Sequence, residues 1–262
     1  MTLLNKNKIL LYLLIFSLGI ISSFSLPPYN LFYINFFSYP ALLWTLLFYS
    51  KDKIVSFNIG WVFGFGYFIS NLYWITNSLT FEDIFKPLIP FALILIPLFL
   101  GLFYGFSTLF FSFLNPQKNF LSILILATAM SVFEYIRSFL FGGFPWNLIA
   151  FSFVNYLEFI QILSIIGTYA FNSLVILLFL FPTILFFNDK RKIKISIFIV
   201  SLLALFTNYF WGNLNLRQFE LTEKKDLGFN IKIISPTINI NRYFQNENPS
   251  EFILELINIS KP

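Results

Sequence analysis

Glu134 and Arg137 are charged residues inside a long apolar stretch, "FLSILILATAMSVFEYIRSFLFGGFPWN" (residues 120–147). Each charge would cost roughly 3 kcal/mol at the centre of a bilayer, and less near its surface. Because the i, i+3 spacing places both side chains on one face of a helix, they can neutralise one another. Two interpretations stay open: the pair supports a polar site near one membrane surface, or it is a structural ion pair that braces the helices.

A tight turn with aromatic residues follows this charged pair. Gly142 and Gly143 allow backbone conformations that other residues avoid, and they precede Phe144, Pro145 and Trp146. Tryptophan prefers the membrane–water interface, and the chain has five of them. An aromatic anchor at the interface is therefore the simpler explanation of this turn, and a substrate-binding role is the alternative.

The overall composition is that of a membrane protein. Hydrophobic residues make up 58% of the 262 positions and charged residues only 11%, against about 25% charged in ordinary soluble domains. The absence of cysteine and histidine excludes disulfides, thiolate metal sites, a thiol nucleophile and the commonest general base within these residues. We therefore predict no metal site and no cofactor, and carboxylates, lysines, tyrosines and hydroxyl groups are what remain for chemistry.

The apolar runs predict a mainly α-helical, polytopic bundle of about seven spans. These spans cover residues 9–26, 31–50, 55–79, 88–114, 120–140, 165–187 and 194–212. From residue 213 onward the chain becomes polar. The sequence thus predicts a transmembrane domain over 1–212 and a water-exposed tail over 213–262.

Basic residues set the predicted orientation of these spans. With the N-terminus in the cytoplasm, the cytoplasmic segments hold nine basic residues and the short external loops hold only Lys86. The nine are Lys6, Lys8, Lys51, Lys53, Lys118, Lys190, Arg191, Lys192 and Lys194. This excess follows the positive-inside rule and places Trp146 and the tail on the external face, which is periplasmic in a bacterium. Since the charges flank apolar spans, the net charge of +5 does not indicate a nucleic-acid partner.

The polar tail carries two short patterns of regular structure. "NIKIISPTINI" (230–240) alternates like a β-strand, and "PSEFILELINIS" (249–260) has the start and the periodicity of a helix. About fifty residues are too few to bury an independent core. We therefore interpret the tail as the incomplete start of an α/β domain.

Several segments resemble the bacterial apolipoprotein N-acyltransferases. "FEYIRSFLFGGFPWN" (133–147) is similar to a family segment in which a Glu-aromatic-x-Arg group precedes a Gly-x-Phe-Pro-Trp turn. Further similarity lies in "SFSLPPYNLFYINFFSYPALLWTL" (23–46), "GWVFGFGYFISNLYW" (60–74) and "IQILSIIGTYAFNSLVI" (160–176). The resemblance extends over residues 9–240, and its most specific part is the Phe-Pro-Trp turn.

The resemblance implies a reaction in the inner membrane of a bacterium. The family transfers an acyl chain from a membrane phospholipid to the N-terminal cysteine amine of a diacylated lipoprotein. A nitrilase-like domain with a Glu-Lys-Cys triad does the chemistry. Phe144, Pro145 and Trp146 would line the lipid-entry side, supported by Glu134, Arg137, Gly142 and Gly143. The polar tail resembles the start of the nitrilase-like domain.

The triad itself is not found in these residues, so this chain is predicted to be the membrane half of such an enzyme and inactive alone. It would be truncated, or a second chain would carry the rest of the nitrilase-like domain. A multi-pass transporter is the alternative, although the spans hold a single charged pair and no inverted repeat between the halves. A non-catalytic scaffold or remnant is the third possibility.

The predicted orientation can be tested with cysteines, since the chain has none of its own. Cysteines placed singly at Asn147 and Asn188 should react with a membrane-impermeant maleimide from opposite sides of sealed vesicles, because the positive-inside rule puts the two positions on opposite faces. Labelling of both positions from the same side would contradict the topology.

Overall fold

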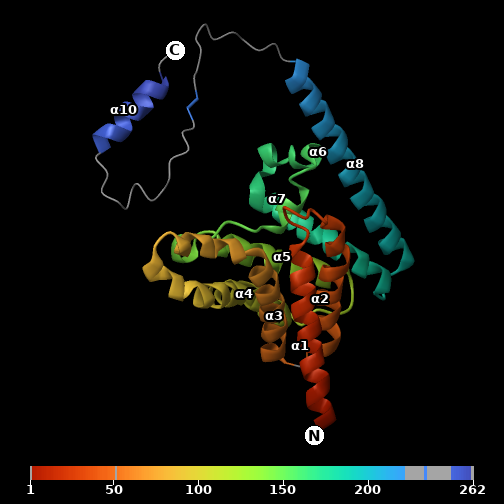
Figure 1. The fold of residues 1–262 in the computed structure, drawn as a ribbon. Coiled ribbons are helices and arrows are strands. Elements are labelled where there is room, and N and C mark those ends of the chain that lie inside the picture. The colour runs from red at the N-terminus through yellow and green to blue at the C-terminus, as the bar shows by residue number, and fades with distance from the viewer. Residues whose placement is uncertain (1, 51, 222–232, 235–248, 261–262) are drawn as a thin grey trace.

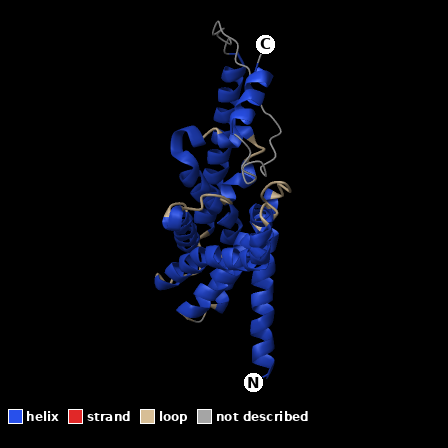
Figure 2. Cartoon of the chain, turned by 60° about the vertical axis from the view of Figure 1, so that its left-hand side comes forward, coloured by secondary structure: helices blue, strands red, loops and turns tan. Residues whose placement is uncertain are grey.

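The computed structural model describes residues 2–50, 52–221, 233–234 and 249–260, and these are almost entirely helical (Figures 1 and 2). The α-helices are α1 (Thr2–Ser23), α2 (Asn35–Tyr49), α3 (Lys53–Asn71), α4 (Ile89–Phe113), α5 (Phe120–Arg137), α6 (Leu157–Ile160), α7 (Leu163–Leu180), α8 (Arg191–Leu221) and α10 (Pro249–Ser260). Short 3₁₀ helices are η1 (Phe32–Ile34), η2 (Tyr73–Thr80), η3 (Asp83–Leu88), η4 (Leu140–Gly142), η5 (Ile149–Phe153) and η6 (Phe181–Phe186). The mainly helical fold is confirmed.

The described part of the chain contains no β-strand. The strand predicted over residues 230–240 lies outside the described residues except for 233 and 234, which have no regular secondary structure. The helix predicted over 249–260 is present as α10.

Helices occupy each of the seven predicted ranges, but only some of them meet the requirements of a membrane span. Within the described residues, four helical segments are long and apolar enough to cross a bilayer: Asp83–Phe113, Phe120–Arg137, Leu163–Phe186 and Arg191–Leu221. A shorter apolar helix covers Lys8–Ser23, and α2 has only 15 residues. Large apolar side chains on the outside, such as Phe91 and Leu185, which are 61% and 69% exposed, suit contact with lipid.

Several helix ends differ from the sequence prediction. The span predicted over 55–79 ends as an α-helix at Asn71 and continues as η2, where short polar residues that compete for backbone hydrogen bonds begin to appear. Within α7, Gly167 has φ +76° and interrupts the helical backbone. Helix α8 continues through residue 213 to Leu221, so the change in composition falls inside a helix.

Glycines allow α1, α3 and α4 to pack with their backbones almost in contact. A Cβ atom on Gly19 of α1 would lie 2.1 Å from the carbonyl oxygen of Phe63 in α3. A Cβ atom on Gly60 of α3 would lie 2.4 Å from the carbonyl oxygen of Tyr104 in α4. Small residues let membrane helices approach in this way, and van der Waals contact then holds them together. Helix α3 is thereby fixed between two neighbours.

Buried aromatic rings fill the space beside this packed trio. Tyr39 of α2 meets Phe63 of α3 with 6.0 Å between ring centroids, and Phe63 meets Tyr104 of α4 at the same separation. Tyr39 also contacts Phe179 of α7. These rings are almost completely buried and connect α2, α3, α4 and α7 into one core. Helix α8 lies at the edge of the bundle (Figure 1) and packs mainly against α6.

Replacement of Gly19 by alanine should destabilise the protein. Intrinsic helix propensity alone would favour alanine by about 1 kcal/mol, but its Cβ atom would collide with the backbone of Phe63, which cannot move aside as a side chain could. Thermal unfolding in detergent, followed by circular dichroism, should show a lower midpoint for Gly19→Ala. Ser17→Ala, on an exposed position of the same helix, is the control and should leave the midpoint nearly unchanged. A Gly19→Ala midpoint at or above that of the parent protein would disprove the close contact.

Candidate functional site

The guanidinium of Arg137 connects the end of α5 to the turn that follows it. Arg137 and Glu134 are 1% and 3% exposed. The Nε of Arg137 donates a hydrogen bond of 3.0 Å to Glu134, and Nη2 donates to the same carboxylate oxygen. Nη1 donates to the carbonyl oxygens of Phe144 and Trp146 at 2.8 and 2.9 Å. Four of the five N–H donors of arginine are therefore used to join Glu134 to the turn.

The turn itself depends on its two glycines. Gly142 and Gly143 have φ angles of +88° and +83°, which lie in the region that disfavours side chains. A Cβ atom on Gly143 would also lie 2.4 Å from the carbonyl oxygen of Ser138. The chain then returns to α5, where the amide of Phe144 donates to the carbonyl of Arg137 at 3.0 Å. The turn is thus closed by one backbone bond and by the Arg137 side chain.

The end of α3 and the segment after it complete the surroundings of the turn. The hydroxyl of Tyr67 donates to the carbonyl oxygen of Asn147 at 2.9 Å. The ring of Trp146 lies 5.3 Å from that of Trp74 and 5.5 Å from that of Phe144. The Arg137 guanidinium also lies over the ring of Phe68, with Cζ 5.2 Å from the ring centroid. Aromatic and carbonyl groups therefore surround the cation.

Trp146 forms part of the wall of a cavity of about 330 Å³. The other walls come from the end of α1, the Pro27-Pro28 turn, the end of α3, the start of η2 and the end of η5. Two amides line it, and the Nδ2 of Asn71 and the Oδ1 of Asn147 are buried without a hydrogen-bond partner. No charged side chain lines this cavity. It suits a neutral group that combines apolar surface with hydrogen-bonding atoms.

The predicted site residues come together only in part. Glu134, Arg137, Phe144 and Trp146 form one connected group, and Trp146 reaches the cavity with 51% of its surface exposed. Phe144 is half-buried beneath it, and Pro145 is exposed. Sequence reasoning missed Trp74 and Asn71 as neighbours of Trp146. Their signal was the aromatic segment over residues 60–74, although spacing alone does not indicate which residues it faces.

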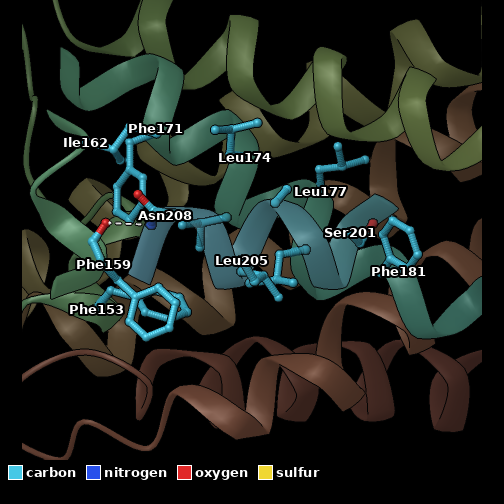
Figure 3. A pocket seen from close by; sticks show the side chains of 13 residues that line it. Phe153, Phe159, Ile162, Phe171, Leu174, Leu177, Phe181, Ser201, Leu205 and Asn208 are labelled. Atoms are coloured by element: carbon cyan, nitrogen blue, oxygen red, sulfur yellow. Dashed lines mark hydrogen bonds between the residues drawn. The ribbon is translucent and has the colours of Figure 1, made fainter. Parts of the chain in front are cut away.

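A second cavity, of about 200 Å³, lies between α7 and α8 and contains none of the predicted site residues (Figure 3). Its walls are almost wholly apolar, with Phe153 and Phe159 toward one end and Phe181 toward the other. Asn208 of α8 closes it by donating to the carbonyl oxygen of Phe159 at 3.1 Å. Ser201 and Asn208 are its polar lining residues, and no charged side chain lines it.

Comparison with known proteins identifies the family. The profile of the apolipoprotein N-acyltransferase N-terminal domain matches residues 18–181. The chain is 30% identical over 253 residues to the apolipoprotein N-acyltransferase of Agrobacterium fabrum, an alignment that covers 92% of this chain and 46% of that protein. The enzyme of the same name from Rhodopseudomonas palustris is 27% identical over 252 residues, with coverage of 92% and 46%. The chain belongs to the apolipoprotein N-acyltransferase family, as its sequence resemblance predicted.

The similarity covers only part of each relative. The chain spans about half the length of the curated relatives that it matches, and the corresponding share is 43% for the protein from Allorhizobium ampelinum, which is 29% identical over 238 residues. The matched profile, which is that of an N-terminal domain, includes the whole Arg137 network and the Trp146 turn.

Removal of the arginine should reveal how strongly the buried pair is coupled. Arg137→Met leaves the Glu134 carboxylate buried and unpaired, and loss of one partner of a buried pair costs about 3–5 kcal/mol. The double variant Glu134→Gln with Arg137→Met should recover part of this loss because no buried charge remains. Unfolding midpoints in detergent are measured for the parent, for Glu134→Gln, for Arg137→Met and for the double variant. Their differences give the coupling between the two side chains. If the double variant loses the sum of the two single losses, the two side chains are not coupled.

Proposed function

We propose that this chain forms the membrane part of an apolipoprotein N-acyltransferase. Such an enzyme would move an acyl chain from a membrane phospholipid to the N-terminal cysteine amine of a diacylated lipoprotein. Family membership supports this proposal, as does the set of apolar helices that could cross a membrane. We further propose seven spans in a bacterial inner membrane, with the N-terminus cytoplasmic and the tail over residues 213–262 periplasmic. The distribution of basic residues supports that orientation.

The Trp146 turn is the proposed entry point for the lipid substrates. The observation that carries this role is the attachment of the turn to α5 by the buried Arg137, which holds Trp146 at the wall of a cavity. An aromatic ring fixed at a membrane surface can guide an acyl chain and its neutral ester region. Glu134 would keep the guanidinium in place, and Gly142 and Gly143 would allow the turn.

The nucleophile for acyl transfer would not come from these 262 residues. In the resemblance stated above, the nucleophile is a cysteine assisted by glutamate and lysine, and these 262 residues contain no cysteine. The helices would position the phospholipid and the lipoprotein, and a nitrilase-like domain in the same or a second chain would perform the transfer.

The proposed role of this chain as the membrane part of the enzyme can be tested in a chimaeric protein. The chain is joined to the part of the Agrobacterium fabrum relative that lies beyond the aligned region, purified, and supplied with phospholipid and a diacylated lipopeptide. The chimaera should form the triacylated product, and Trp146→Ala should lower its rate several-fold with normal expression. Mass spectrometry of the lipopeptide measures the product.

Two controls separate guidance of substrate from general packing. Trp44→Ala removes another partly exposed tryptophan, which stacks on Phe48 in α2, and should leave the rate nearly unchanged. The chain alone should give no product because it has no thiol nucleophile. Product from the chain alone would refute the assignment of the chemistry to other residues, and a collapse of Trp146→Ala expression would show that the turn serves packing only.

A further inference from the structure

A large cavity lies at the opposite end of the helices from Trp146. It has a volume of about 620 Å³ and is bounded by the end of α2, the α4–α5 connection and the α7–α8 connection. Helix α3 begins at Lys53, just after α2, and ends at Asn71 beside the Trp146 cavity. Its 19 residues span about 28 Å at the usual helical rise, which is close to the thickness of a bilayer core. The two cavities therefore lie near opposite ends of α3.

Positive charge collects at this second surface. Lys118 and Lys190 line the cavity, and Arg191 and Lys192 follow directly with exposed side chains. Asp189 is the only acidic residue in the cavity wall. Its carboxylate accepts a hydrogen bond of 2.9 Å from the amide of Phe120 and thereby caps the start of α5. The cavity thus has two cationic groups available, against one carboxylate that is engaged within the protein.

The cations sit beside apolar surface. The Nζ of Lys118 lies 3.2 Å from the centroid of the Phe48 ring, so a cation–π contact orients the ammonium group over the end of α2. Leu47 and Ile193 also line the cavity. Lys194 is not available to a ligand in the same way, because its Nζ donates to the carbonyl oxygen of Leu185 at 3.2 Å. The lysine ammonium groups of this cavity can pair with a phosphate, and its apolar side chains can contact the hydrocarbon chains attached to that phosphate.

We propose that this cavity, which we call the basic cavity, binds the phosphate headgroup of an anionic phospholipid. Lys118 and Lys190 contact the phosphate, Arg191 and Lys192 add long-range attraction, and Leu47 with Ile193 contact the upper part of the acyl chains. The phosphate of an anionic lipid is favoured over a zwitterionic headgroup because the latter carries its own cation. The proposal is independent of acyl transfer, since the basic cavity lies at the surface opposite Trp146.

Direct binding measurements test the proposal. The full chain is held in detergent micelles doped with phosphatidylglycerol or phosphatidylcholine, and native mass spectrometry counts the bound lipid. Phosphatidylglycerol should be retained in preference to phosphatidylcholine. Combined Lys118→Gln and Lys190→Gln should weaken phosphatidylglycerol binding roughly tenfold or more, because each basic residue near an anionic lipid surface contributes a several-fold factor.

Further variants test whether Lys118 and Lys190 are the residues that bind the lipid phosphate. Lys118→Arg with Lys190→Arg keeps the charge and should keep the affinity, whereas Lys86→Gln should not change it. Lys86 is an exposed lysine outside the basic cavity and pairs with Asp83. If the double glutamine variant does not fold, Lys190→Gln alone should still weaken binding several-fold, because its side chain is exposed. Unchanged affinity in Lys190→Gln would then overturn the proposal.

Two further results would also overturn it. Equal retention of phosphatidylglycerol and phosphatidylcholine would show that the basic cavity does not select anionic lipids. Displacement of phosphatidylglycerol by millimolar glycerol phosphate would indicate a site for a free soluble phosphate. Acyl-transfer activity of the chimaera is not used as a readout here, so failure of this proposal and failure of the proposed function are distinguishable.

Discussion

The burial of the Arg137 guanidinium is the interaction on which the structure of the site depends. A cation inside a helix bundle requires partners for its charge and for its N–H groups. Glu134 provides the charge, and the carbonyl oxygens of Phe144 and Trp146 provide the remaining acceptors. The chain after α5 must therefore fold back toward the helix, which explains why it needs two glycines with positive φ angles. These contacts show the pair as a structural brace, and its support of a functional site stays a prediction.

Helix α3 relates this site to the rest of the molecule. Its glycine-mediated contacts with α1 and α4 leave no space for a side chain at the crossing points, so its position is tightly restricted. Tyr67 near its end bonds to Asn147, and Asn71 lines the Trp146 cavity. The position of α3 in the core therefore fixes the surroundings of the turn.

The two ends of the helices differ in their chemistry. The Trp146 cavity is lined by aromatic, amide and hydroxyl groups without a charge, whereas the basic cavity has lysines in its wall. This difference agrees with the orientation proposed from the positive-inside rule. A neutral, aromatic surface suits the ester region of lipid substrates, and a basic surface suits retention of anionic lipid on the other leaflet. Acyl transfer at the first surface remains part of the proposed function.

Sequence alone was sufficient for the features that depend on neighbours along the chain. Apolar runs predicted the helices, the i, i+3 spacing predicted the Glu134–Arg137 pair, and the Gly-Gly step predicted the turn. Motifs over residues 133–147 indicated the family, and the comparisons confirm it. The end of the third helix at Asn71 and the continuation of α8 to Leu221 were not predicted, because hydropathy marks apolar length and does not mark where backbone hydrogen bonding stops.

Contacts between distant segments were decided by the tertiary structure. The ring contact of Trp74 with Trp146, the hydrogen bond from Tyr67 to Asn147 and the hydrogen bond from the amide of Phe120 to Asp189 join residues far apart in sequence. Composition and periodicity show which face of a helix is apolar. They do not show which other helix that face contacts, or at which level along the helix axis. These contacts are set in the folded structure, because close packing at the glycines and the hydrogen-bond acceptors that the buried Arg137 requires favour one arrangement of the helices.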